Sequence, residues 1–157
     1  MTAALLVALA AAVLVARWMV RHRFAVMNVD GISMEPALQH GDRLLVRRCK
    51  PARVRAGRIV VVERPDRRTG WSGARHGDGR VRAGSRDWYV KRAVAVGGQR
   101  VPTALAELCR LPADAQVPGD SLLLLGDNPR SEDSKQWGYC PGDRLLGVVV
   151  RRLGRRG

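Results

Sequence analysis

After residue 25 the chain has only short hydrophobic runs, which are rich in Val and Leu and are separated by Gly, Pro and Asp. Runs of this length between turn-forming residues are typical of β-strands. The clearest cover residues 44–46, 59–62, 88–96, 122–125 and 145–150. Because no convincing amphipathic helix follows residue 25, the sequence predicts a mostly β fold, a compact antiparallel β-sheet domain at residues 24–157. Only residues 103–109 are expected to form a helical turn or two.

The one long apolar run covers residues 3–20 and is interrupted only by Arg17. As a helix, a run of this length extends about 27 Å, close to the thickness of the hydrocarbon core of a bilayer. The stem of Arg17 can lie in lipid while its charged head reaches the membrane interface, and Trp18 suits the same interface. The sequence therefore predicts one transmembrane helix with a basic juxtamembrane segment at residues 1–23. A cleavable signal peptide is disfavoured because no Lys or Arg precedes the run, and a buried helix because the run has no polar face.

The charge of the chain narrows the range of partners. Lys and Arg number 28 against 14 Asp and Glu, which gives a net charge of +14. Such a balance favours anionic partners, either nucleic acid or anionic membrane lipids. The arginines are scattered, without zinc-finger spacing or interleaved aromatic residues, so no nucleic-acid partner is expected.

Cys49, Cys109 and Cys140 lack metal-ligand spacing, and three buried thiols are favoured over one disulfide with a free thiol.

Residues 64–87 form the longest stretch without strand character, with five glycines, seven arginines and few aliphatic residues. This composition predicts a long loop between two strands. Two interpretations remain open: a solvated insertion, or a segment that contacts anionic lipid or substrate.

Ser33 is a candidate nucleophile in a turn-like stretch, with Gly31 two residues before it and Pro36 three residues after it. A serine hydroxyl needs a neighbouring base before it becomes a good nucleophile. The histidines are poor candidates for this base, because no His–Asp arrangement is visible in the sequence; they are His22, His40 and His76.

Lys91 is the better candidate base, because it is a charged residue in the middle of an apolar strand. On a strand, Tyr89, Ala93 and Ala95 share its face, and none of them carries a carboxylate. Burial among such neighbours lowers the pKa of a lysine and makes a neutral amine available. The alternative is a surface lysine on an edge strand.

A third block, Gly-Asp-Asn-Pro-Arg-Ser-Glu-Asp-Ser-Lys, follows the leucine run and covers residues 126–135. Together with the Ser33 and Lys91 blocks, it resembles the type I signal peptidases over roughly residues 28–150. These enzymes are membrane-bound serine endopeptidases that use a Ser–Lys dyad. The resemblance implies that Ser33 is the nucleophile and Lys91 the general base, without a metal or cofactor. It also implies precursor proteins with signal or leader peptides as substrates, cleaved after a small residue at Ala-X-Ala sites.

The resemblance further implies that Ser131 orients the lysine amine and that Asp133 braces this region through a salt bridge. The segment before Ser131 is one residue shorter than is common, which keeps Ser134 as an alternative. Lys135 stands where an arginine partner of Asp133 is usual, and Arg92 is expected to be an extra partner of Asp133.

The remaining site residues are also implied by the resemblance. The main-chain N–H of Ser33 is expected to contribute to the oxyanion hole, within a turn shaped by Gly31. Some members carry a hydroxyl at the position of Gly31, so here the hole must rely on backbone donors. Met34, with Tyr89 and Val90, is expected to line the substrate pocket, although Met34 is also compatible with a core position. Ala37 stands where the family usually has Thr. The segment between residues 101 and 122 is short and leaves no room for a second β subdomain.

The location of the domain has two conflicting indications. Arg17, Arg21, His22 and Arg23 follow the centre of the apolar run, and the positive-inside rule would keep the domain in the cytoplasm. The resemblance implies a single-pass protein of the cell membrane with an extracytoplasmic domain, and we favour that arrangement.

The sequence leaves three alternative functions, with unequal support. A dedicated maturation protease that removes the leader of one partner protein on the cytoplasmic side is the main alternative. A self-cleaving repressor of the same Ser–Lys clan would need a DNA-binding segment, which the apolar N-terminus excludes. A non-enzymatic scaffold is disfavoured by the intact set of Ser33, Lys91 and Ser131.

Overall fold

The computed structural model describes residues 2–66, 68–72 and 88–155, with side chains from residue 6 onward. Most of the loop predicted at residues 64–87 therefore lies outside the described residues. The helices are α1 (Thr2–Arg23), α2 (Thr103–Leu108) and α3 (Ser134–Trp137), with short 3-10 turns at Pro51–Arg53 and Gly142–Arg144. The strands are β1 (Phe24–Asn28), β2 (Asp42–Arg48), β3 (Ile59–Glu63), β4 (Trp88–Val96), β5 (Leu122–Leu125) and β6 (Leu145–Arg155).

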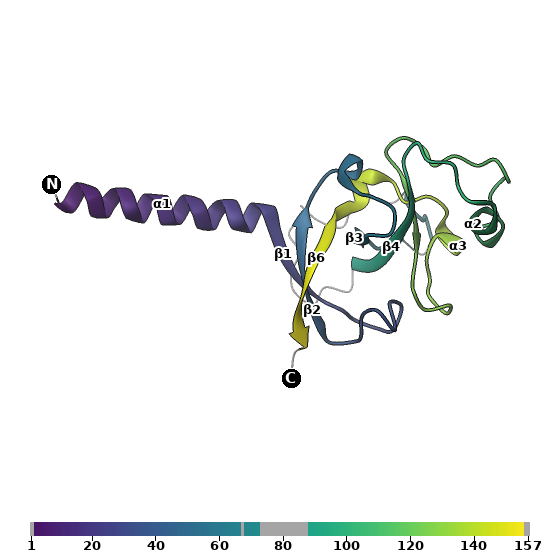
Figure 1. Ribbon diagram of the computed structural model, residues 1–157, viewed down its shortest axis with the longest axis horizontal. Coiled ribbons are helices and arrows are strands. Elements are labelled where there is room, and N and C mark those ends of the chain that lie inside the picture. Colours follow the sequence, from purple (N-terminus) through teal and green to yellow (C-terminus); the bar gives the residue numbers. More distant parts are fainter. Residues whose placement is uncertain (1, 67, 73–87, 156–157) are drawn as a thin grey trace.

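The strands form one antiparallel sheet in the order β1-β2-β6-β3-β4-β5 (Figure 1). The hydrophobic runs predicted as strands all lie in this sheet, and the helical turns expected at residues 103–109 correspond to α2. β1 directly follows α1 and pairs with β2, from Phe24 opposite Arg47 to Asn28 opposite Arg43. The mostly β domain that the sequence predicts is confirmed.

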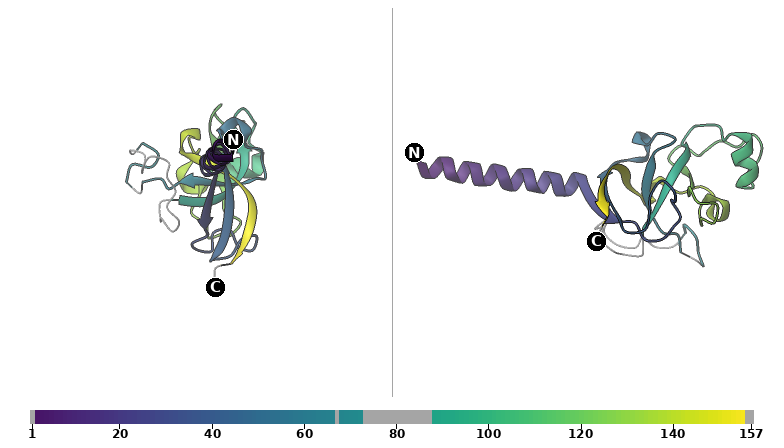
Figure 2. Two further views of the ribbon diagram at one scale, coloured as in Figure 1. Left: turned by 90° about the vertical axis from the view of Figure 1, so that its left-hand side faces the viewer. Right: turned by 60° about the horizontal axis from the view of Figure 1, so that its bottom comes forward.

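α1 extends away from the sheet, as Figure 1 and the right-hand view of Figure 2 show. Its described apolar side chains are largely exposed; they include Leu6, Val7, Leu9, Leu14 and Trp18. Nevertheless, within the described residues no helix is both long enough and apolar enough to cross a lipid bilayer. A helix thus occupies the position of the predicted transmembrane segment, but the structure does not confirm a membrane span.

The apolar core is divided into three clusters along the sheet. The first lies between β1, β2 and the turn after β1, and contains Met27, Met34, Leu44 and Val46. The second lies around β3, β4 and β5, and the third lies between α2 and β5.

Cys109 and Cys140 are buried and Cys49 is partly buried, all three as free thiols. Burial raises the pKa of the Cys140 thiol far above its ordinary value, which makes this thiol unreactive.

The candidate site lies beside β4, at the point where its pairing with β5 ends. β5 pairs with β4 only from Arg92, opposite Leu125, to Val96, opposite Leu122. In the described part of the chain, β4 therefore has no strand partner on this side from Trp88 to Lys91. Instead, the chain leaves β5 at Gly126, and the segment that follows contacts Lys91 through Ser131.

Candidate active site

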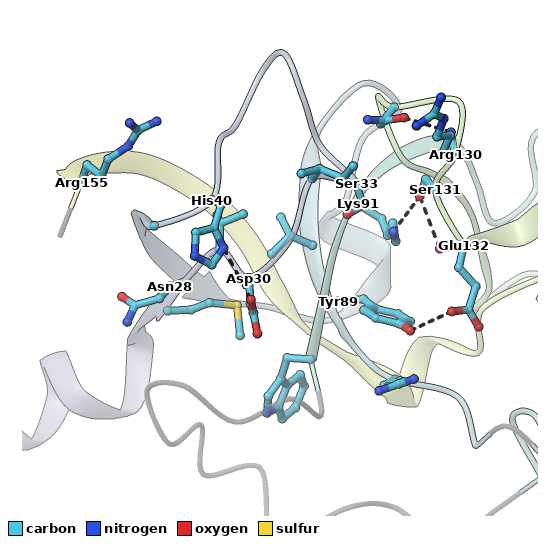
Figure 3. Close-up of a pocket in the computed structure, with 18 residues that line it drawn as sticks. Asn28, Asp30, Ser33, His40, Tyr89, Lys91, Arg130, Ser131, Glu132 and Arg155 are labelled. Atoms are coloured by element: carbon cyan, nitrogen blue, oxygen red, sulfur yellow. Dashed lines mark hydrogen bonds and ion pairs between the residues drawn. The ribbon is translucent and has the colours of Figure 1, made fainter. Parts of the chain in front are cut away.

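Lys91 is buried in β4, with a relative exposure of 1%. Its Nζ donates a hydrogen bond of 2.7 Å to Oγ of Ser131, which comes from the loop after β5 (Figure 3). The structure therefore brings together Lys91 and Ser131, whose contact the family resemblance implied. Ser134, the alternative partner, lies elsewhere: its Oγ accepts the main-chain N–H of Leu124 and holds α3 against β5.

The environment of Lys91 favours the neutral amine. Burial lowers the pKa of Lys91 to about 8, because desolvation disfavours the ammonium form. The carboxylates of Asp133 and Glu132 oppose this shift, and the positive charge of Lys135 reinforces it. The strand neighbours of Lys91 carry no carboxylate, as the sequence indicated, but the loop after β5 supplies two.

Two aromatic rings stand beside the Lys91 amine. Nζ lies 5.0 Å from the centre of the Tyr89 ring and 5.8 Å from that of Trp137. The two rings are stacked, 5.3 Å apart and inclined by 10°, and the Tyr89 hydroxyl donates to Oε2 of Glu132 at 3.1 Å. Tyr89 lies on the face of β4 that period-two alternation predicts. These rings exclude water from one side of the amine.

Asp133 is fully buried and organises the loop that carries Ser131. Its Oδ2 accepts from the main-chain N–H of Gly126 at 2.9 Å and from Nζ of Lys135 at 2.8 Å. It also caps α3, in a capping box with Gln136. The pairing of Asp133 with Lys135 is the one that the sequence suggested.

Arg92 does not pair with Asp133, so that part of the sequence prediction is wrong. Its guanidinium binds Asp127 through two hydrogen bonds of 2.8 and 2.6 Å. The reason is strand geometry: Arg92 follows Lys91 on β4 and points to the opposite face of the sheet. Arg92 therefore holds the start of the loop after β5, while Lys91 contacts its centre.

The turn that carries Ser33 is tied to the same loop. The main-chain O of Ser33 accepts from the N–H of Asn128 at 3.1 Å. Gly31 has φ of +98°, a conformation that glycine adopts most readily. The Ser33 N–H makes no hydrogen bond to any described residue.

Ser33 and Lys91 line one open cleft of about 920 Å³. Tyr89, Ser131 and Glu132 lie on one side of it, and Asn28, Asp30 and His40 on the other (Figure 3). Tyr89 and Val90 line the cleft, as the sequence suggested. Met34 does not: it is fully buried in the first core cluster, which fits the alternative interpretation of this residue.

His40 and Asp30 form a pair that the sequence did not reveal. Nδ1 of His40 lies 3.5 Å from Oδ1 of Asp30 and accepts the main-chain N–H of Gly31 at 3.2 Å. Both side chains are exposed. The imidazole thus contacts the backbone of the turn before Ser33 through Nδ1.

Sequence reasoning also missed Glu132, Trp137 and the role of Asp127. Glu132 directly follows Ser131, so its position beside the cleft could have been inferred from that assignment. Trp137 and Asp127 gave no comparable signal, because their contacts with Tyr89 and Arg92 join distant parts of the chain.

Two comparisons with known proteins give matches to the sequence. The sequence matches the family described as signal peptidase, peptidase S26, over residues 2–111 and 102–153. It is also similar to a probable signal peptidase I-2 of Synechocystis sp., with 28% identity over 148 residues. This match covers 80% of the chain and 61% of the relative. The chain therefore spans less than two thirds of the length of this curated relative.

Proposed function

Because the chain belongs to the signal peptidase family, peptidase S26, we propose that it is a serine endopeptidase that removes N-terminal signal peptides from precursor proteins. The observation that carries the proposal is the buried amine of Lys91, hydrogen-bonded to Ser131 in the cleft that Ser33 lines. A desolvated lysine next to a serine is a known way to activate the hydroxyl without a histidine.

In the proposed reaction, the neutral amine of Lys91 removes the proton of the Ser33 hydroxyl as Oγ attacks the scissile carbonyl. The ammonium that forms is stabilised by Ser131 Oγ and by the negative charges of Glu132 and Asp133. It then gives its proton to the leaving amine, which departs with the mature protein. Water, activated by the regenerated amine, hydrolyses the acyl ester and frees Ser33.

The N–H of Ser33 is proposed as an oxyanion donor, because it has no partner among the described residues. Gly31 provides no side-chain hydroxyl, so further donors must come from the backbone. In other hydrolases, one such donor contributes about 2.7–4 kcal/mol to transition-state stabilisation.

We propose that the substrate binds as an extended strand. The stretch of β4 from Trp88 to Lys91 has no strand partner on its β5 side in the described part of the chain. A peptide added at this edge would pass Tyr89 and Val90 and present its scissile carbonyl to Ser33. Cleavage after a small residue in an Ala-X-Ala sequence is part of this proposal.

Attachment to the cell membrane through α1 is a further part of the proposal. It is supported by the exposed apolar side chains of the helix and by the basic residues at its end, Arg21, His22 and Arg23. Anionic lipids would attract this basic end and the exposed arginines of β6, each by roughly 1 kcal/mol. An extracytoplasmic position of the sheet domain follows the family, whereas the basic end of α1 favours the cytoplasm.

That basic end also supports a second candidate, a dedicated maturation protease that removes the leader of one partner protein on the cytoplasmic side. Reporter fusions at Gly157 would separate the two, because they report on which side of the membrane the C-terminus lies.

The first test is cleavage of a preprotein with an Ala-X-Ala site by the full-length protein in detergent. We expect the wild type to cut after the second Ala, and Ser33→Ala and Lys91→Met to lose activity while remaining folded by circular dichroism. Full activity in either variant would contradict the assignment of the dyad. If the folded wild type cut no preprotein, the maturation protease would become the favoured function.

A further inference from the structure

Glu132 is an exposed carboxylate of the cleft, close enough to Lys91 to raise the pKa of its amine. Three buried or half-buried acids near the site are neutralised within the chain, in the pairs Asp127–Arg92, Asp133–Lys135 and Glu63–Arg144, whereas Glu132 is exposed. In the described part of the chain, no Lys, Arg or His lies within ion-pair distance of Glu132. Its recorded side-chain partner is the neutral hydroxyl of Tyr89, 3.1 Å away.

Glu132 also joins two hollows of the surface. It lines the main cleft together with Ser33 and Lys91. It equally lines a second hollow of about 550 Å³, whose other walls include Trp71, Gln136 and Trp137. A side chain of a peptide bound in the cleft can therefore reach the second hollow past Glu132.

The walls of this second hollow suit a positively charged side chain. Trp71 and Trp137 meet edge to face, 5.8 Å apart, and Trp137 stacks on Tyr89. Aromatic faces attract Lys and Arg side chains, and a carboxylate at the rim completes such a site. Arg64 already stands over the Tyr89 ring in the main cleft, but the described lining of the second hollow contains no Lys or Arg.

We propose that Glu132 is a specificity-determining residue, which favours substrates with a Lys or Arg side chain close to the scissile bond. The side chain would lie against Trp137 in the second hollow, with its charge paired with the Glu132 carboxylate. This proposal rests on the proposed function, since it names a preference of the same peptidase.

The test uses peptides with an Ala-X-Ala site, in which successive flanking positions carry either Lys or norleucine. Norleucine matches the Lys stem but has no charge, so the ratio of kcat/KM for the two isolates the contribution of the charge. Measurement at about pH 9 keeps Lys91 mostly neutral while the peptide lysine remains charged. We expect a preference for Lys of about fivefold at one position or more.

In Glu132→Gln this preference should disappear, with a kcat/KM ratio of about 1 for the Lys and norleucine peptides. The matched control is Glu107→Gln, which removes an exposed charge on α2 and should preserve the preference. The proposal is overturned if no position favours Lys, or if the preference persists in Glu132→Gln.

Binding separates this proposal from the proposed function. The Kd of the same peptide pairs, measured with the Ser33→Ala variant, requires no cleavage. Tighter binding of the Lys peptide that depends on Glu132 would support the specificity proposal even if the wild type cut no peptide. Cleavage of the norleucine peptides without any Lys preference would support the peptidase and reject the role of Glu132.

Discussion

Gly126 and Ser131 approach so closely that a side chain at the glycine is excluded. A Cβ atom at Gly126 would lie 2.1 Å from Oγ of Ser131 and 2.5 Å from the main-chain O of Ser33. One glycine therefore allows the Ser131 hydroxyl and the turn that carries Ser33 to lie close together.

Gly126→Ala should consequently displace Ser131 and the turn of Ser33 relative to Lys91 while leaving the sheet folded. Displacement of a reacting group by about 1 Å costs roughly 100-fold in rate, and we expect a loss of kcat/KM of that order. Gly119→Ala is the matched control, because a Cβ there meets no atom within 4 Å. Equal activity of the two variants in a peptide cleavage assay would reject this role of Gly126.

The pH dependence of cleavage should report on Lys91. Its pKa is lowered to about 8, and only the neutral form can accept the serine proton. We expect kcat/KM to rise tenfold per pH unit below about pH 8 and to level off above it. A profile that is flat from pH 6 to about pH 9 would show that no group of this kind controls the reaction.

Single charge changes in the loop after β5 should move this profile in opposite directions. Glu132→Gln removes a charge that raises the pKa of Lys91, so the acid limb should shift to lower pH. Lys135→Gln removes a charge that lowers it, so the limb should shift to higher pH. Lys135→Gln should also destabilise the fold by about 3 kcal/mol, because it leaves Asp133 buried without its ion-pair partner. Shifts of the same sign in both variants would contradict the electrostatic explanation.

Burial of Lys91 should make the protein less stable below pH 8 than above it. The unfolded chain keeps this proton up to about the ordinary pKa of 10.5, whereas the folded protein loses it at about 8. Between these values the unfolded state binds more protons, so the free energy of unfolding should increase with pH, by about 3 kcal/mol in all.

Lys91→Met removes this dependence and fills a similar volume. At pH 7 we expect it to be about 2 kcal/mol more stable than the wild type. Removal of the buried ammonium stabilises the fold by about 3 kcal/mol, and loss of the hydrogen bond to Ser131 offsets about 1 kcal/mol of this gain. Urea unfolding at pH 7 and at about pH 10 measures both effects. A variant that is less stable than the wild type at both pH values would show that the amine stabilises the fold.

The strands were predictable because each is a short apolar run between turn residues, and that pattern depends only on neighbours in the sequence. The contact of Lys91 with Ser131 came from a family resemblance, since no local pattern connects residues on β4 and in a loop. Arg92 was assigned to the wrong acid although strand alternation already placed it on the face opposite Lys91. The stacking of Tyr89 on Trp137 was not predictable, because it depends on how α3 folds back toward β4.

The stretch of β4 from Trp88 to Lys91, which has no strand partner on its β5 side in the described part of the chain, has a consequence for solubility as well. An open strand edge can pair with any extended chain, including another copy of the same protein. An inward-pointing charge is one of the features by which natural sheets prevent such association. Lys91 is the charged residue of this stretch, so the proposed general base also protects the edge against aggregation. Variants such as Lys91→Met should therefore be tested for self-association at high protein concentration before a loss of activity is attributed to chemistry.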